Sequence, residues 1–158
     1  MSKIYWEDLV PGSVRQLGTV TPTREEIIDF AQKFDPQPFH LSEEGGKASL
    51  FGGLSASGWH TCSMAMGLMV RNFLLNSSSL GSPGLENIKW LKPVHPGDTL
   101  RLEHEILDSR PLKSKPDVGL TRTVWRMYNQ DGDQVLHMEG ASMFRRRHPA
   151  TNHPTPAS

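Results

Sequence analysis

The sequence predicts an α+β fold in which the helices come first and antiparallel strands follow. Up to about residue 75 the apolar residues recur at helical spacing, and after about residue 80 they alternate with polar residues. Early helices followed by a run of strands are typical of α+β domains. The chain has 158 residues and no visible linker or repeat, so we expect one domain over residues 1–147. Residues 148–158 are rich in proline and have no large apolar side chain, which predicts a disordered tail.

Two helices are expected in the first half of the chain. Thr23 and Glu26 form a capping box, and apolar residues then recur at helical spacing as far as Phe34. This first helix is expected to end before Pro36, which disfavours helical geometry at the preceding residue. A longer helix is expected over residues 58–75. Its expected apolar stripe consists of Trp59, Cys62, Met66, Met69, Val70 and Phe73.

Four strands are expected in the second half. Leu100, Leu102, His104 and Ile106 alternate with charged residues, as in a half-buried strand. Residues 84–91, 120–129 and 134–146 predict three more strands, and a turn over residues 129–133 joins the last two. We expect the long helix to lie across a curved antiparallel sheet formed by these strands.

Charge and composition exclude several classes of protein. The 17 basic and 17 acidic residues cancel, which argues against a nucleic-acid-binding surface or an anionic membrane surface as the partner. The single cysteine, Cys62, cannot form an internal disulfide, and no spacing of ligands indicates a metal site. The N-terminus lacks the apolar stretch of a signal peptide, and no segment approaches the roughly 20 apolar residues of a membrane span. We therefore expect a soluble, cytoplasmic protein.

The first candidate site is the segment Asp35-Pro36-Gln37-Pro38-Phe39-His40. The two prolines predict a stiff, extended connection that holds Asp35 and His40 at a fixed spacing. Asp35 stands at the expected C-terminus of the first helix, where the helix dipole together with burial is expected to raise its pKa. Such a carboxylate and a histidine can polarise one water molecule. Ordinary turn hydrogen bonding is the alternative interpretation.

The second candidate is the run of small residues from Gly52 to Gly58, directly before the long helix. Free amide groups at a helix start can donate hydrogen bonds to a developing oxyanion. A close-packed loop that enters a buried helix is the alternative. The other histidines and Cys62 are interpreted as surface, turn or core residues, and the absence of a GxSxG pattern gives no support for a serine nucleophile.

These segments together resemble the MaoC-like dehydratases, which include the R-specific enoyl-CoA hydratases. The family pattern Asp-x-Asn-Pro-x-His is matched by residues 35–40, with Gln37 in place of the asparagine. The resemblance continues through Gly58 and the following helix, then through residues 90–100, and covers about residues 6–144. It implies a single hotdog domain, in which a curved antiparallel sheet wraps a long central helix.

The resemblance also implies a hydro-lyase that reversibly adds water to a 2-enoyl thioester and gives a 3-hydroxyacyl thioester. Asp35 and His40 would activate the water, the Gly58 amide would hold the thioester carbonyl, and Gln37 belongs to the substrate-binding set. Coenzyme A or an acyl-carrier protein is the implied carrier of the acyl group, with no further cofactor. A homodimer, or a higher homo-oligomer, is the implied assembly.

Two positions depart from the family pattern. Gln37 extends the usual amide by one methylene, and Met66 stands where many hydratases have a serine of the catalytic site. Two alternatives therefore remain beside the hydratase. One is a non-catalytic acyl-CoA-binding hotdog module, and the other is a hotdog thioesterase, whose water attacks the carbonyl carbon.

Overall fold

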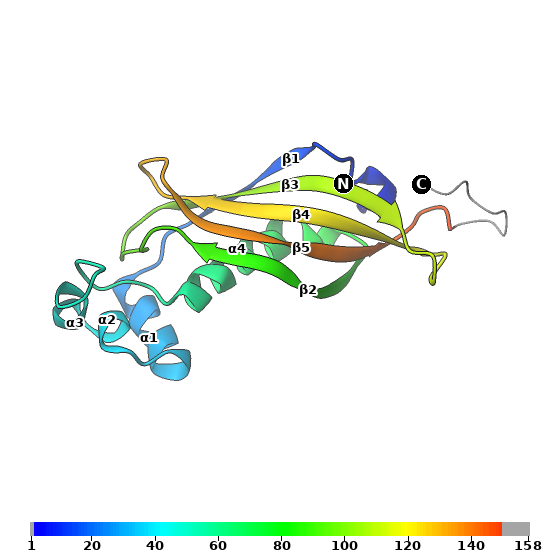
Figure 1. Cartoon of the computed structure of the whole chain (residues 1–158). Coiled ribbons are helices and arrows are strands. Elements are labelled where there is room, and N and C mark those ends of the chain that lie inside the picture. The colour runs from blue at the N-terminus through cyan, green and yellow to red at the C-terminus, as the bar shows by residue number, and fades with distance from the viewer. Residues whose placement is uncertain (1, 150–158) are drawn as a thin grey trace.

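The computed structural model describes residues 2–149 and shows a five-stranded antiparallel sheet that curves around one long helix (Figure 1). The helices are α1 (Arg24–Phe34), α2 (Pro38–Leu41), α3 (Glu43–Lys47) and α4 (Gly58–Asn72), with single 3₁₀ turns at Trp6–Asp8 and Leu74–Asn76. The strands are β1 (Val14–Val20), β2 (Ser79–Trp90), β3 (Leu100–Pro111), β4 (Val118–Tyr128) and β5 (Gln134–Arg145). The predicted α+β class and the hotdog arrangement are confirmed.

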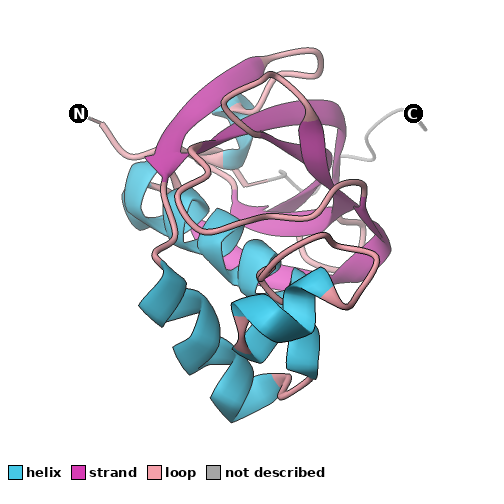
Figure 2. Cartoon of the chain, turned by 90° about the vertical axis from the view of Figure 1, so that its left-hand side faces the viewer, coloured by secondary structure: helices cyan, strands magenta, loops and turns pink. Residues whose placement is uncertain are grey.

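The sheet has the order β1-β3-β4-β5-β2, so the strands that flank the helical region in sequence, β1 and β2, form its two edges. All pairings are antiparallel. Helix α4 lies along one face of the sheet, and α1, α2 and α3 gather beyond one end of it (Figures 1 and 2). This arrangement places the start of α4 against the three shorter helices, away from the middle of the sheet.

The predicted alternation in β3 is confirmed. Leu100, Leu102, His104 and Ile106 are at most 2% exposed and pack in the core, while Arg101 faces solvent. The turn before β5 also forms, because the Asn129 side-chain oxygen accepts hydrogen bonds from the Asp131 and Asp133 amides. The sequence does not predict strand β1, because only Leu17 in it is buried and no alternation is visible.

The apolar stripe expected on the long helix is partly wrong. Met69 and Phe73 are buried as expected, but Trp59 is 56% exposed and Met66 is 44% exposed. The helix face that packs against the core is offset by one residue from the predicted stripe. It includes Thr61, Ala65, Leu68 and Met69. The reason is that Trp59 and Met66 border a cavity between the helix and the sheet instead of filling the core. Cys62 borders the same cavity but is partly buried and packs against the core, as expected.

The stiff extended connection expected between Asp35 and His40 is confirmed only as far as Gln37, whose backbone is extended. Pro38 begins α2, because the first position of a helix needs no N–H donor, so His40 lies on one short helical turn. The loop after α3 is close-packed, as the alternative interpretation of residues 52–58 proposed. A Cβ on Gly46 would overlap the Gly53 carbonyl group, so the two backbones are in direct contact.

Residues 150–158 of the expected tail lie outside the described residues, and the domain limits stay a prediction. Within residues 2–149 no helix has both the length and the apolar character that a membrane crossing requires.

Candidate active site

The candidate active site forms where α1 ends, α2 turns and α4 begins. Asp35 follows the last residue of α1, and His40 lies on α2. The structure brings them together, with the Asp35 Oδ2 atom 3.3 Å from the His40 Nε2 atom. His40 is buried, and Asp35 is largely covered. A carboxylate and an imidazole at this distance can exchange a proton or share a water molecule.

The orientation of the His40 ring is fixed by the backbone of the close-packed loop. The His40 Nδ1 atom lies 2.7 Å from the carbonyl oxygen of Ser55, to which it donates a hydrogen bond. The Ser55 amide in turn donates to the Phe39 carbonyl oxygen at 3.0 Å, which ties this loop to α2. Because Nδ1 carries the donated proton, Nε2 is left as the atom that faces Asp35.

Asp35 is held by hydrogen bonds to both of its carboxylate oxygens. The Gln37 side-chain amide donates to Oδ1 and the Ser57 hydroxyl donates to Oδ2, each at 2.7 Å. Burial raises the pKa of Asp35, but these two hydrogen bonds and the nearby charge of His40 outweigh it, so the pKa is lowered. The expectation of a raised pKa is therefore wrong, because it considered only the dipole of α1 and the burial of Asp35.

Gln37 donates a hydrogen bond to the Asp35 carboxylate, but Gln37 does not line the cavity beside that carboxylate. Ser57, which the sequence reasoning missed, is fully buried and caps α4 by accepting a hydrogen bond from the Trp59 amide at 3.3 Å. A serine directly before the expected start of a helix is the usual N-cap signal, and this signal is present in the sequence. Its second contact, the hydrogen bond to Asp35, depends on the tertiary fold.

Gly58 is the first residue of α4, so its N–H has no acceptor within the helix. A side chain at this position has no room, since a Cβ would lie 2.5 Å from the Trp90 ring. The Trp90 indole N–H also donates to the Gly58 carbonyl oxygen at 2.8 Å. Trp90 therefore fixes the start of α4 and requires glycine there.

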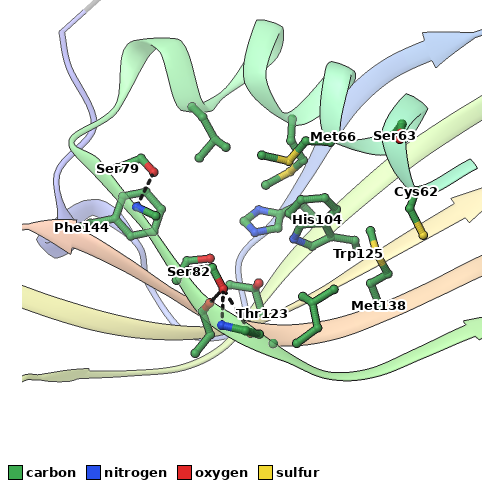
Figure 3. A pocket seen from close by; sticks show the side chains of 18 of the residues that line it. Cys62, Ser63, Met66, Ser79, Ser82, His104, Thr123, Trp125, Met138 and Phe144 are labelled. Carbon is green, nitrogen blue, oxygen red and sulfur yellow. Dashed lines mark hydrogen bonds between the residues drawn. The ribbon is translucent and has the colours of Figure 1, made fainter. Parts of the chain in front are cut away.

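A cavity of about 440 Å³ opens beside these groups. Asp35, His40 and Gly58 line it, together with the aromatic rings of Phe51, Trp59 and Trp90. A second cavity of about 500 Å³ lies between α4 and the sheet (Figure 3). Trp59 lines both cavities, so the two spaces adjoin at this side chain.

Three other histidines, His60, His95 and His104, make no side-chain hydrogen bond to Asp35 or His40 among the described residues. His60 is buried against the Phe30 ring, with ring centroids 4.7 Å apart, and burial lowers its pKa. His95 contacts the Leu54 carbonyl oxygen at 2.9 Å, and His104 lines the second cavity. Among residues 2–149, no group of three or more His, Cys, Asp or Glu side chains is arranged to hold a metal ion.

Known proteins are similar to this chain in fold and in sequence. The family model of MaoC-like domains matches residues 9–127. A solved MaoC-like dehydratase from Rhodospirillum rubrum is 36% identical, with a TM-score of 0.84 over 92% of this chain and 99% of that one. The uncharacterised protein YdeM of Bacillus subtilis is 26% identical over 89% of this chain and 98% of its own length. Mesaconyl-CoA hydratase of Cereibacter sphaeroides is 35% identical over 59% of this chain, which spans only 26% of that protein.

The hydrogen bond from Gln37 predicts how Asp35 titrates. We expect Gln37→Ala to raise the pKa of Asp35, because one of the interactions that favour the carboxylate is lost while burial remains. At pH values above the ordinary aspartate pKa of about 4, a pKa that is lowered in the folded state raises the free energy of unfolding. This gain is lost as the pH falls through the folded-state pKa. The variant should therefore lose less stability than the wild type between about pH 5 and pH 3.

NMR titration of the Asp35 carboxyl carbon measures the pKa directly, and urea unfolding at each pH measures the stability. Gln32→Ala is the matched control, because Gln32 is an exposed glutamine on α1. An unchanged Asp35 pKa in the Gln37 variant would show that this hydrogen bond does not set the titration.

Proposed function

Since the chain belongs to the family of MaoC-like domains, we propose that it is a hydro-lyase of the enoyl-CoA hydratase type. Its reaction is the reversible addition of water to a 2-enoyl thioester, which gives a 3-hydroxyacyl thioester. The observation that carries this proposal is the contact of 3.3 Å between Asp35 and His40, in a cavity that Gly58 also lines. A general acid–base pair and a backbone donor in one cavity are the groups that this reaction requires.

Asp35 and His40 hold the water and move its protons. The water oxygen bonds to the β carbon as the carbon–carbon π bond breaks, and a proton is delivered to the α carbon, so nothing is oxidised or reduced. The Ser55 carbonyl oxygen keeps His40 Nδ1 protonated, which leaves His40 Nε2 and the Asp35 carboxylate as the groups that handle protons. Ser57 and Gln37 position the carboxylate through their hydrogen bonds.

The Gly58 N–H stabilises the charge that develops on the thioester oxygen. Addition of water to the β carbon produces an enolate, in which negative charge moves to the carbonyl oxygen. A backbone donor at the start of a helix stabilises that charge more than it stabilises the neutral substrate, and this difference lowers the barrier. The Trp90 contacts hold this donor in place.

The carrier of the acyl group is proposed to be coenzyme A or an acyl-carrier protein, within fatty acid metabolism. The name of the mesaconyl-CoA hydratase relative supports a coenzyme A thioester substrate. We propose no further cofactor, because addition of water involves no change in oxidation state. The cytoplasm is the proposed compartment, because this is where we expect such thioesters to be formed and used.

The first prediction of this proposal concerns the catalytic pair. We expect Asp35→Asn and His40→Ala each to lower kcat by about 10²–10⁴-fold, because each removes a proton-transfer group. The measurement is the loss of enoyl absorbance with linear and branched 2-enoyl-CoA substrates. Asp29→Asn is the matched control, because Asp29 is an exposed carboxylate on α1 that pairs with Lys33, and it should retain full activity.

Two outcomes would overturn the hydratase, and a third would overturn the role of the catalytic pair. Release of free thiol from saturated acyl-CoA without hydration would indicate the thioesterase. Tight binding of acyl-CoA without any turnover would indicate the non-catalytic module, for which Gln37 and Met66 are the sequence features. Full activity in both variants would remove Asp35 and His40 from the mechanism.

A second prediction concerns the start of α4. Gly58→Ala should lower kcat by about 10²–10³-fold, because the new methyl group overlaps the Trp90 ring and displaces the backbone donor. Gly67→Ala on the same helix is the matched control, since a Cβ there meets only the flexible end of Arg71 at 3.0 Å. The measurement is the kcat of each variant, after circular dichroism has shown that both variants are folded. Equal kcat values would show that the Gly58 donor takes no part.

A third prediction concerns assembly. We propose a homodimer, or a higher homo-oligomer, that forms through β2, a 12-residue edge strand paired only with β5 in the described chain. Long unpaired edges favour pairing with another strand, and Leu85 is 51% exposed there. Sedimentation equilibrium should give at least twice the chain mass of 17.7 kDa. A monomer at micromolar concentration would contradict this.

A further inference from the structure

The bridge segment, residues 54–56, lies between α2 and the connection from β2 to β3, at the end of the sheet where the short helices gather (Figure 1). All three of its residues are buried. The Ser55 carbonyl oxygen of this segment accepts the hydrogen bond from His40 Nδ1 and so determines how the His40 ring is oriented. Whatever fixes the bridge segment therefore also fixes His40.

The backbone of the bridge segment is bonded on both sides. The Ser55 N–H donates to the Phe39 carbonyl oxygen of α2 at 3.0 Å, and the Ala56 N–H donates to the Val94 carbonyl oxygen at 2.8 Å. The Ala56 N–H and the Ser55 carbonyl group belong to one peptide unit. The hydrogen bond to Val94 therefore polarises this unit and strengthens its oxygen as an acceptor for His40.

Two side chains hold the backbone of Leu54, at the start of the bridge segment. The Glu43 Oε1 atom of α3 accepts a hydrogen bond from the Leu54 N–H at 3.1 Å. The His95 Nδ1 atom donates to the Leu54 carbonyl oxygen at 2.9 Å. Both side chains converge on Gly53, where a Cβ would lie 2.7 Å from Glu43 Oε1 and 3.9 Å from His95 Nδ1. Glycine at this position leaves room for both contacts.

His95 is itself held by hydrogen bonds to the loops at this end of the sheet. Its backbone N–H donates to Asp98 Oδ2 at 2.9 Å, and Asp98 Oδ1 accepts from the Gln130 side-chain amide at 3.1 Å. Asp98 precedes β3, and Gln130 lies in the turn before β5. These contacts hold His95, and with it the Leu54 carbonyl oxygen, in a fixed place relative to the sheet.

We propose that His95 and Glu43 are positioning residues that act on His40 through Leu54. They hold the two backbone polar groups of Leu54 and thereby place the Ser55 carbonyl oxygen, which keeps the His40 proton on Nδ1. The inference rests on the proposed function, and it adds two residues that line neither of the two cavities in the described chain. Loss of either contact leaves a buried backbone group without its partner, so the bridge segment shifts. The His40 ring then populates the tautomer in which Nε2 carries the proton and cannot accept one.

The first test compares two variants of His95 that differ in one property. His95→Asn keeps an N–H donor close to the place of Nδ1, whereas His95→Leu has a side chain of similar size without a donor. We expect His95→Leu to lower kcat about tenfold with a change in KM below about twofold, and His95→Asn to stay within about threefold of the wild type. The measurement is the loss of enoyl absorbance over a range of 2-enoyl-CoA concentrations.

His137→Leu is the matched control for this pair of variants. His137 is a partly exposed histidine of β5 that contacts Glu139, and its variant should retain full activity. Equal kcat values in His95→Leu and His95→Asn would overturn the role of the His95 hydrogen bond. A loss that appears in KM alone would also overturn it, because positioning of a proton-transfer group acts on kcat.

The second test changes Glu43 and applies even where a His95 variant does not fold, because Glu43 is exposed on α3. Glu43→Met removes the acceptor for the Leu54 N–H at similar side-chain length, and Glu43→Gln keeps an acceptor oxygen. We expect kcat to fall about three- to tenfold in Glu43→Met and to stay within about twofold in Glu43→Gln. Glu44→Met is the matched control, since Glu44 is the next exposed residue of the same helix. Equal kcat values in the two Glu43 variants would exclude Glu43 from positioning.

The tautomer of His40 is a readout that does not depend on turnover. NMR of the ring nitrogen atoms at mildly alkaline pH, where histidine rings are neutral, distinguishes a proton on Nδ1 from one on Nε2. We expect the Nδ1 form in the wild type and in His95→Asn, and a larger share of the Nε2 form in His95→Leu and Glu43→Met. A purely structural role would reduce the amount of folded protein without changing this share. An unchanged tautomer in both variants would overturn the inference, whatever their activity.

The same measurement separates this inference from the proposed reaction. If every 2-enoyl-CoA is inert but the His40 tautomer shifts as expected, the hydratase fails while the positioning of His40 stands. If 2-enoyl-CoA is hydrated and neither kcat nor the tautomer changes in the variants, the hydratase stands and the roles of His95 and Glu43 fail.

Discussion

The hydrogen bond between the Ser57 hydroxyl and the Asp35 carboxylate is the constraint on which the candidate site depends. It joins the end of α1 to the start of α4 at 2.7 Å, across 22 positions of sequence. Everything that the proposed chemistry uses lies within this junction: His40 on the short helix between them, and the free Gly58 N–H one residue after Ser57. A serine thus acts at once as the cap of α4 and as the support of the acid–base pair.

This junction also explains why the carboxylate is stabilised in a position that looks unfavourable in the sequence. Asp35 follows the C-terminus of α1, where the helix dipole opposes a negative charge. In the folded chain the same carboxylate lies against the N-terminus of α4, where the dipole has the opposite sign and the N-cap hydroxyl donates to it. Together with the Gln37 amide, this environment outweighs the effect of burial and lowers the pKa of Asp35, so the carboxylate stays ionised and can accept a proton in the proposed reaction.

The parts of the fold that the sequence predicted are those in which one residue pattern determines one structure. The alternation in β3 reports burial directly, because successive strand residues face opposite sides. Edge strand β1 and the short helices α2 and α3 have no such pattern, and their positions depend on contacts with distant segments. Likewise, the sequence indicated the pair Asp35 and His40, whereas the contact of Ser57 with Asp35 exists only after α1 and α4 have met.

The sequence wrongly predicted which apolar residues of α4 are buried, and the physical reason bears on the proposed function. A helix that only covered a core would bury its largest apolar side chains, but here Ala65 and Leu68 pack inward while Trp59 and Met66 stand beside a cavity. Large side chains that border empty space lose the packing they would gain in a filled core, which is a cost typical of binding sites. The offset face of α4 therefore separates two tasks. Residues such as Ala65 and Leu68 pack in the core, whereas Trp59 and Met66 border the cavity between the helix and the sheet, which adjoins the cavity of Asp35 and His40 at Trp59.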